Sequence, residues 1–106
     1  MTTLEDLKRR GTGFLPGYMG VVVTGLADQE LRAELTIQRH HIAPNGFLHA
    51  GTVVTLADTA CGYGCVARAQ HLGRTTQLWD AVVSHADSGK TIALFRCTQL
   101  VLYAKT

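Results

Sequence analysis

A single carboxylate lies in the middle of a segment that is otherwise small and apolar. Asp58 is the only acidic residue between Glu34 and Asp80. Around it, residues 50–65 carry apolar and small side chains at helical spacing, which predicts a helix that does not face water. Burial of that helix would desolvate the carboxylate and raise its proton affinity, which suits a general base or a nucleophile. The alternative is a capped or salt-bridged acid that faces a subunit interface.

The predicted helix begins at residues that can stabilise negative charge on an oxygen atom. The backbone N–H groups of Ala50 and Gly51 fall in its first turn, where the helix dipole is positive. His49 comes directly before them and either positions the chain by hydrogen bonding, the interpretation we favour, or transfers a proton. Asn45 either orients a water molecule or forms a turn with Gly46.

Strands on both sides of this helix must hold it in place. Residues 20–24 are rich in β-branched side chains and residues 30–37 alternate between polar and apolar, so they predict an antiparallel hairpin. Residues 75–85 and 91–103 predict two longer strands joined by a turn. The order of hairpin, buried helix and long hairpin predicts an α+β fold in which an antiparallel sheet wraps around one helix.

The segments that flank these elements are predicted with less regular structure. Thr2–Glu5 resembles a capping box that opens a short helix ending near Arg10, and we expect this helix to be a surface arm or flap outside the core. Residues 13–18 contain Gly and Pro and predict a loop. Residues 66–70 either continue the central helix or begin a strand.

Length and composition restrict the class of protein. With 106 residues, 46% of them hydrophobic, the chain predicts one domain over residues 1–106. A net charge of +2 and 7% aromatic residues provide no basic stripe or stacking platform, so we expect no nucleic-acid partner. No apolar run reaches the roughly 18 residues of a membrane span, and the first ten residues lack a signal peptide's apolar stretch, so we expect no membrane partner and a cytoplasmic location.

Three cysteines give a further expectation about cofactors. An odd number of cysteines argues against a disulfide framework, so we interpret Cys61, Cys65 and Cys97 as reduced core thiols. Cys61 and Cys65 share a helix face, and zinc coordination with a nearby histidine is the alternative. Because paired zinc-knuckle spacings are absent, we expect neither a metal nor another cofactor.

Two motifs carry a resemblance to a known family. Residues 44–51, Pro-Asn-Gly-Phe-Leu-His-Ala-Gly, and the Leu-Ala-Asp-Thr-Ala of residues 56–60 resemble the hotdog-fold acyl-CoA thioesterases of the phenylacetic acid degradation type. Those proteins place an acid nine positions after a histidine, which here are Asp58 and His49. The resemblance continues through residues 71–76 and the closing hairpin.

The resemblance implies a reaction and a catalytic set. It implies hydrolysis of acyl-CoA, with aromatic or medium-chain acyl groups, to a free acid and CoA. Asp58 would attack the acyl carbon or activate water, and the N–H of Ala50 or Gly51 would face the thioester oxygen. The family's site is shared between subunits of a homodimer or homotetramer, so Asn45, His49 and Ala50 would face Asp58 of the partner subunit.

The resemblance also implies where the CoA moiety would bind. Arg74 and Thr75 lie in the segment that resembles the family's glycine-containing basic turn, and we expect Arg74 and Thr75, with Arg68 or Lys90 as further basic candidates, to contact the CoA phosphates. The alternative for each basic residue is a solvated surface position.

The chain departs from the family's pattern after Cys65. A loop and a strand of the family, roughly 20 to 35 residues by length, are absent between Cys65 and Val66. Their loss would expose apolar helix surface and a sheet edge. An inactive hotdog remnant that binds acyl-CoA or has a structural role is therefore the main rival to the thioesterase, and a hotdog hydratase or dehydratase is a second.

Overall fold

The chain folds into two antiparallel hairpins, a long central helix and two short helices. The computed structural model describes residues 2–28, 30–68 and 74–102, without the side chains of residues 68, 74–76 and 100–102. In chain order the elements are α1 (Leu4–Arg10), α2 (Leu15–Met19), β1 (Val22–Ala27), β2 (Glu30–Glu34), the 3-10 helix η1 (Arg39–His41), α3 (Ala50–Arg68), β3 (Arg74–Ser84) and β4 (Thr91–Leu102).

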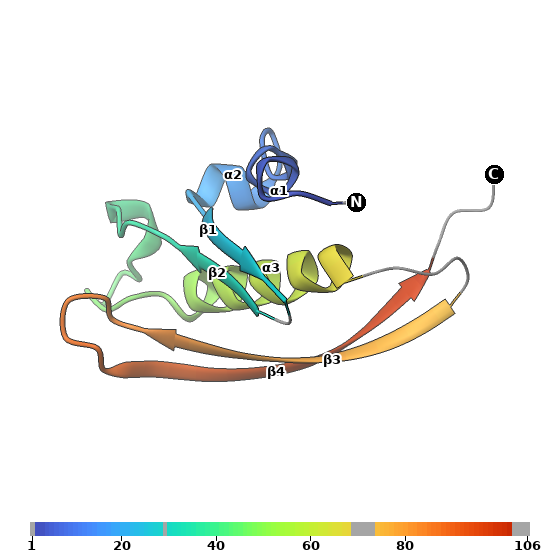
Figure 1. Ribbon diagram of the computed structural model, residues 1–106. Helices are drawn as coiled ribbons and strands as arrows, with labels where there is room; N and C mark the ends of the chain where they lie inside the picture. Colours follow the sequence, from blue (N-terminus) through green and yellow to red (C-terminus); the bar gives the residue numbers. More distant parts are fainter. Residues whose placement is uncertain (1, 29, 69–73, 103–106) are drawn as a thin grey trace.

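Helix α3 contacts both hairpins, and in Figure 1 the β1–β2 hairpin crosses it while the long β3–β4 hairpin runs beneath it. Strand β1 pairs with β2, and β3 pairs with β4, both antiparallel. Helix α1 packs on β1, and both β2 and the β3–β4 hairpin pack on α3. This arrangement confirms the predicted α+β fold and is that of a hotdog fold, with antiparallel strands around a central helix. Within the described residues, however, the strands form two separate two-stranded sheets.

The core forms where small side chains of α3 meet the strands. Val23 of β1, Ala57 and Cys61 of α3, and Val83 of β3 are all buried. Gly64 allows an especially close approach, because a Cβ atom there would lie 2.7 Å from the ring of Trp79. The sequence of α3 therefore suits a sheet that lies directly against the helix.

Helix α1 contributes to this core, so the prediction of a surface arm is wrong. Leu7 is only 1% exposed, on the helix that packs against β1. The predicted capping box is present, although its partners are Thr3 and Asp6: the Thr3 hydroxyl accepts from the Asp6 N–H at 3.2 Å, and the Asp6 carboxylate accepts from the Thr3 N–H at 3.0 Å. A buried leucine on a capped helix fixes this segment to β1.

Residues 13–18 were predicted as a loop, but residues 15–19 form the short helix α2. Pro16 lies in its first turn, where its missing N–H has no helical partner to lose. Gly20 ends the helix in the left-handed conformation with φ of 82°, and its N–H bonds back to the helix. Pro16 and Gly20, residue types that are typical of turns, thus mark the beginning and the end of this short helix.

Helix α3 is longer than predicted. It continues from Ala50 to Arg68, which settles the alternative for residues 66–68 in favour of the helix; residues 69 and 70 lie outside the described part of the chain. No helix in the described ranges is both long and apolar enough to cross a membrane.

Candidate active site

The loop before α3 is a compact turn with its own hydrogen bonds. Ile42 and Leu48 form an isolated antiparallel bridge, and the N–H of Ala43 donates to the Phe47 carbonyl at 2.7 Å. At the tip, the side-chain oxygen of Asn45 accepts from the Phe47 N–H at 3.1 Å. This contact gives Asn45 a turn-forming role, and its exposed side chain lies at the surface of the chain.

His49 caps the start of α3. Its Nδ1 accepts the N–H of Gly51 at 2.7 Å, and its carbonyl accepts the N–H of Thr52 at 3.0 Å. Because Nδ1 accepts, it carries no proton in this arrangement. A Cβ atom on Gly51 would lie 2.9 Å from this nitrogen, so a glycine is needed for the ring to fold back over the helix. His49 therefore positions the first turn.

The hydrogen bond to His49 makes the two predicted backbone donors, the N–H groups of Ala50 and Gly51, different from each other. The Gly51 N–H donates to His49 in this conformation, which leaves the Ala50 N–H as the other of the two predicted donors. Among the described residues, no hydrogen bond is found to the N–H of Ala50, and the side chain of Ala50 is exposed. An accessible donor thus lies at the positive end of a 19-residue helix.

Asp58 lies on an exposed face of α3, so the burial of the carboxylate that the helix pattern predicted is not found within the single chain. The side chain is exposed, and Val54, one turn earlier, is 49% exposed. The buried positions, Thr52, Ala57 and Cys61, lie on another face that meets the strands. An apolar helix pattern shows that a face is to be covered but does not show what covers it.

The spacing along α3 separates Asp58 from Ala50. At a rise of 1.5 Å per residue, eight residues correspond to about 12 Å along the helix axis. The two groups of one chain therefore cannot act together on one carbonyl group, for which the reacting atoms must approach to about 3–3.5 Å.

His41 is a site residue that the sequence analysis missed. It is 1% exposed, its Nδ1 accepts the Gln38 N–H at 2.8 Å, and its Nε2 lies 2.7 Å from the Met19 carbonyl. A carbonyl only accepts, so Nε2 carries the proton and the ring is neutral. The adjacent His40 is exposed, and nothing in the residue types distinguishes the two.

The backbone of His41 joins this ring to the start of α3. Its carbonyl accepts both the His49 N–H and the Thr52 hydroxyl, each at 3.0 Å. His41 thereby links the end of α2, the loop and the first turn of α3.

Cys61 is unsuited to act as a nucleophile. Burial raises the pKa of its thiol to about 12, and contact with Cys97 and the negative charges of Asp58 and Asp80 act in the same direction. A thiol of this kind stays protonated at neutral pH. Within the described residues no cysteine forms a disulfide, and Cys61 serves packing between α3 and the long hairpin.

The side chains predicted to contact CoA lie outside the described part of the structure. Arg68 is the last residue of α3, and Arg74 and Thr75 begin β3. The backbone places all three at the same end of the long hairpin as the C-terminus of α3, opposite to the end at which α3 begins.

A groove of about 790 Å³ lies between the two hairpins. Its walls are residues 30–34 of β2 and residues 78–84 of β3, and its floor is α3 around Ala57 and Cys61. Since β2 pairs only with β1 and β3 only with β4 in the described chain, both walls are unpaired strand edges. The groove thus has open strand edges among the described residues, whereas the helix surface at its floor is buried at Ala57 and Cys61.

Comparisons with known proteins give several relatives, among them the following two. The protein named Putative esterase PA1618 from Pseudomonas aeruginosa is 28% identical over 130 aligned positions, which cover 93% of this chain and 89% of that protein. The proofreading thioesterase EntH of Cronobacter sakazakii is 25% identical over 130 positions, which cover 94% of each. No protein-family model matches the chain. Both alignments are longer than the 106 residues of this chain, so they contain positions at which it has no residue.

Proposed function

We propose that the protein hydrolyses thioesters of coenzyme A. The observation that carries this proposal is the open N–H of Ala50 at the start of α3, held in place by the His49 cap. A donor of this kind stabilises the oxyanion that forms when a carbonyl is attacked. The names of the two relatives, an esterase and a thioesterase, support the same class of reaction.

The chemistry needs a donor and an activated nucleophile. The Ala50 N–H would bind the thioester oxygen, and the Asp58 carboxylate would either attack the acyl carbon or take a proton from the water that attacks it. The carbon–sulfur bond then breaks, and the sulfur of CoA leaves and takes up a proton. Water is consumed overall, and a carboxylic acid and free CoA are released.

The complete site requires two copies of the chain. Because Ala50 and Asp58 of one copy are about 12 Å apart along α3, the acid must come from a second copy whose α3 lies against the first. This arrangement would also cover the exposed face that carries Val54 and Asp58. We infer a homodimer or homotetramer with composite sites.

The substrate class is narrower in our proposal than in the names of the relatives. The motifs around Asn45 and Asp58 resemble the phenylacetic acid degradation type, so we propose aromatic acyl-CoA esters as substrates. We further propose that Arg68, Arg74 and Thr75 contact the CoA phosphates, and that no metal or other cofactor takes part.

A specific observation favours a second candidate function. The strand edges that border the groove are unpaired among the described residues, and the alignments to the two relatives contain positions that this chain lacks. We place the missing residues after Cys65, at the end of the helix that forms the groove floor. If the absent strand is needed for turnover, the protein is an acyl-CoA-binding or structural oligomeric module.

Thiol release from acyl-CoA separates the two candidates. The purified protein is incubated with phenylacetyl-CoA, a medium-chain acyl-CoA and acetyl-CoA, and free CoA is titrated with a thiol reagent. We expect Asp58→Asn to lower thiol release on the order of a hundredfold or more, while Asp87→Asn in the exposed β3–β4 turn has no effect. Saturable binding without release across the panel supports the module, and equal turnover of Asp58→Asn and the wild type excludes Asp58 from the reaction.

A further inference from the structure

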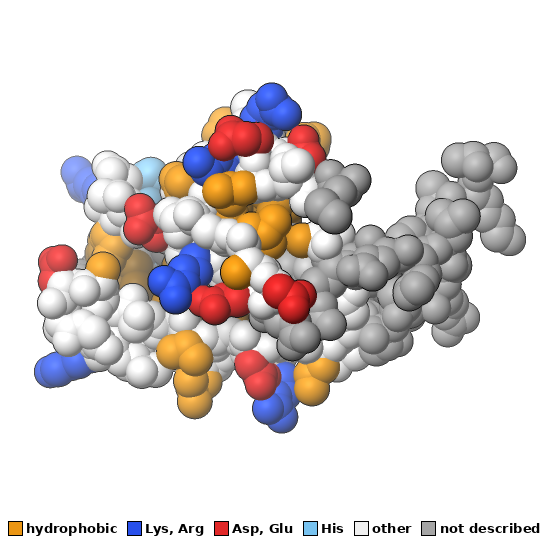
Figure 2. Space-filling model, in the orientation of Figure 1, with side chains coloured by type: hydrophobic (Ala, Val, Ile, Leu, Met, Phe, Trp, Pro, Cys, Tyr) orange, Lys and Arg blue, Asp and Glu red, His pale blue; other side chains and the backbone are white. Residues whose placement is uncertain are grey.

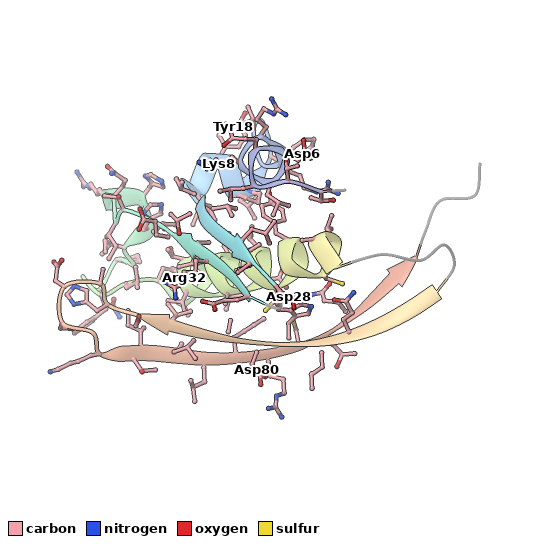
Figure 3. All side chains as sticks on the ribbon, viewed as in Figure 1. Asp6, Lys8, Tyr18, Asp28, Arg32 and Asp80 are labelled. Atoms are coloured by element: carbon pink, nitrogen blue, oxygen red, sulfur yellow. The ribbon has the colours of Figure 1, made fainter. Side chains whose placement is uncertain are left out.

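Three cysteines lie where α3 packs on the long hairpin, and the proposed reaction uses none of them. Cys61 and Cys65 are buried on α3, and Cys97 is half-buried on β4. The thiols of Cys61 and Cys97 are in direct contact through a hydrogen bond. Figure 3 shows sulfur atoms, drawn in yellow, between α3 and the β3–β4 hairpin. Two reduced sulfur atoms from different elements therefore touch in the core.

The register of the hairpin places Cys97 on the face toward α3. Cys97 is the cross-strand neighbour of Trp79, so the two side chains lie on the same face of the sheet. The ring of Trp79 lies against Gly64 of α3, where a Cβ atom would be 2.7 Å from it. Gln77, on the same face of β3, donates to the Cys65 carbonyl at 3.5 Å. The end of α3 therefore packs on the part of the sheet that carries Cys97.

Small side chains bring the helix and the sheet close together at this point. A disulfide needs two Cα atoms no more than about 7 Å apart, and large side chains between a helix and a sheet would prevent that approach. Gly64 has no side chain, and Ala57 and Cys61 are the small buried side chains beside it. The Gln99 amide donates to the Cys97 sulfur at 3.3 Å and holds it on this face. The two thiols therefore need only a small shift to reach bonding distance.

We propose that Cys61 and Cys97 form a modification site at which a hydroperoxide joins the two sulfur atoms in a disulfide bond. The bond ties α3 to β4 and closes a loop over residues 61–97, which restricts the unfolded chain. This site is separate from the proposed thioester hydrolysis, because neither sulfur takes part in that reaction. The mass of the chain therefore reports on the disulfide whatever the protein hydrolyses.

A small oxidant has a route to these thiols. Cys61 lies on the floor of the groove between the hairpins, and Cys97 is partly exposed. Glu30 and Arg32 of β2 also line the groove and are exposed, so its wall is polar. Figure 2 shows charged side chains, in red and blue, at the short hairpin, where Figure 3 labels Arg32. A molecule as small and polar as hydrogen peroxide can therefore reach the contact between α3 and β4.

The reaction consumes one molecule of hydrogen peroxide. Burial raises the pKa of the Cys61 thiol to about 12, so this thiol keeps its proton and the more exposed Cys97 reacts first. The Cys97 sulfur attacks one peroxide oxygen, the oxygen–oxygen bond breaks, and the thiol proton leaves with the other oxygen as water. The Cys61 sulfur then attacks the sulfur of this sulfenic acid, the sulfur–oxygen bond breaks, and the Cys61 proton leaves with the hydroxyl group as a second water. The two thiols lose two electrons, the peroxide is reduced to water, and no charged sulfur remains in the core.

Peptide mapping after oxidation tests the site. The purified protein is treated with hydrogen peroxide, the remaining thiols are alkylated with iodoacetamide, and the chain is digested with trypsin and chymotrypsin without a reductant. Cleavage after Tyr63 separates Cys61 from Cys65, so the assignment does not depend on a variant. We expect the intact chain to lose two hydrogen atoms, Cys65 to be alkylated, and the peptide with Cys61 to be joined to the peptide with Cys97. Dithiothreitol should return all three cysteines to the alkylated form.

Two matched variants sharpen this result. Cys61→Ala and Cys65→Ala each remove one buried thiol from α3. Cys65→Ala should form the linked peptides as the wild type does, and Cys61→Ala should form none. Three alkylated cysteines in the peroxide-treated wild type, a link between Cys65 and Cys97, or a disulfide between two chains would each overturn the proposal. Circular dichroism verifies the folding of both variants.

Stability distinguishes a bond that fits the native fold from one that distorts it. Because the bond restricts the unfolded chain, the oxidised wild type should unfold at a higher urea concentration than the reduced wild type. Cys61→Ala should have the same urea midpoint before and after peroxide, which controls for oxidation elsewhere in the chain. An oxidised wild type with a midpoint no higher than that of the reduced chain would also overturn the proposal.

Discussion

The loop before α3 and the groove between the hairpins differ in whether their backbone N–H and C=O groups find hydrogen-bond partners within the chain. In the loop, His41 and His49 satisfy the backbone groups around them within the chain, apart from the N–H of Ala50. In the groove, the edges of β2 and β3 are unpaired within the described residues. The Ala50 donor thus lies in a loop held by hydrogen bonds within the chain, whereas the sheet around the helix has unpaired edges in the described residues. Loop substitutions should therefore have large effects, and groove substitutions small ones.

The largest effect on activity is expected from removal of the backbone N–H of Ala50. Ala50→Pro deletes the proposed oxyanion donor, and proline is well tolerated as the first residue of a helix. We expect kcat for thiol release to fall about 100–1,000-fold with the helix content unchanged. Ala50→Gly keeps the N–H and should retain activity within about threefold of the wild type. Equal activity of the proline and glycine variants would exclude this donor.

The second-largest effect is expected on the free energy of unfolding, through the loop before α3. His41→Leu leaves the Met19 carbonyl and the Gln38 N–H without their buried partner, so we expect a loss of about 2–4 kcal/mol in the free energy of unfolding. His40→Leu, at the exposed neighbouring position, should change it by less than about 0.5 kcal/mol. Urea titration of both variants measures the difference. Similar midpoints for the two would show that the buried ring does not hold the loop.

A pair of substitutions in α3 measures how open the groove is. Ala57 is 2% exposed, so Ala57→Leu should cost about 1–3 kcal/mol through overpacking. Ala60 is less buried and also lines the groove, so Ala60→Leu should cost less than about 1 kcal/mol. Equal losses in urea titrations would mean that the groove is filled in solution.

The smallest effect depends on pH. Burial raises the pKa of the Cys61 thiol from 9.0 to about 12, so between these values the unfolded chain has lost a proton that the folded chain keeps. The stabilisation is complete below about pH 9 and decreases as the pH rises toward 12. The difference in stability between wild type and Cys61→Ala should thus be constant from about pH 6 to about pH 8 and shrink above about pH 9. A constant difference up to about pH 11 would contradict the assigned cause.

The sequence predicted the elements whose signals are local. The small, apolar helical pattern of α3, the turn chemistry before Thr91 and the capping signal at Thr2–Glu5 all led to the observed elements, with the cap and the ends shifted by a few residues. Helix α2 was missed because Gly13, Pro16 and Gly17 are read as turn residues, although proline in a first turn and a following glycine also bound a short helix.

The candidate site was less accessible to sequence reasoning because it depends on contacts between elements. Periodicity indicated that the face of α3 with Asp58 should be covered, but the chain itself leaves that face exposed. The engagement of Gly51 by His49 depends on the direction of one ring, which residue types do not determine. Likewise, only the folded chain distinguishes the buried His41 from the exposed His40.

Complementation between two inactive variants tests the central claim most directly. Asp58→Asn retains the Ala50 N–H, and Ala50→Pro retains the carboxylate, so a mixed dimer holds one intact composite site and one with both groups lost. The two variants are unfolded in urea, mixed in equal amounts and refolded together, with wild type treated in parallel. Random pairing predicts about a quarter of the wild-type thiol release from the mixture. A mixture no more active than either variant alone, at a mass that shows mixed assemblies, would contradict the shared site.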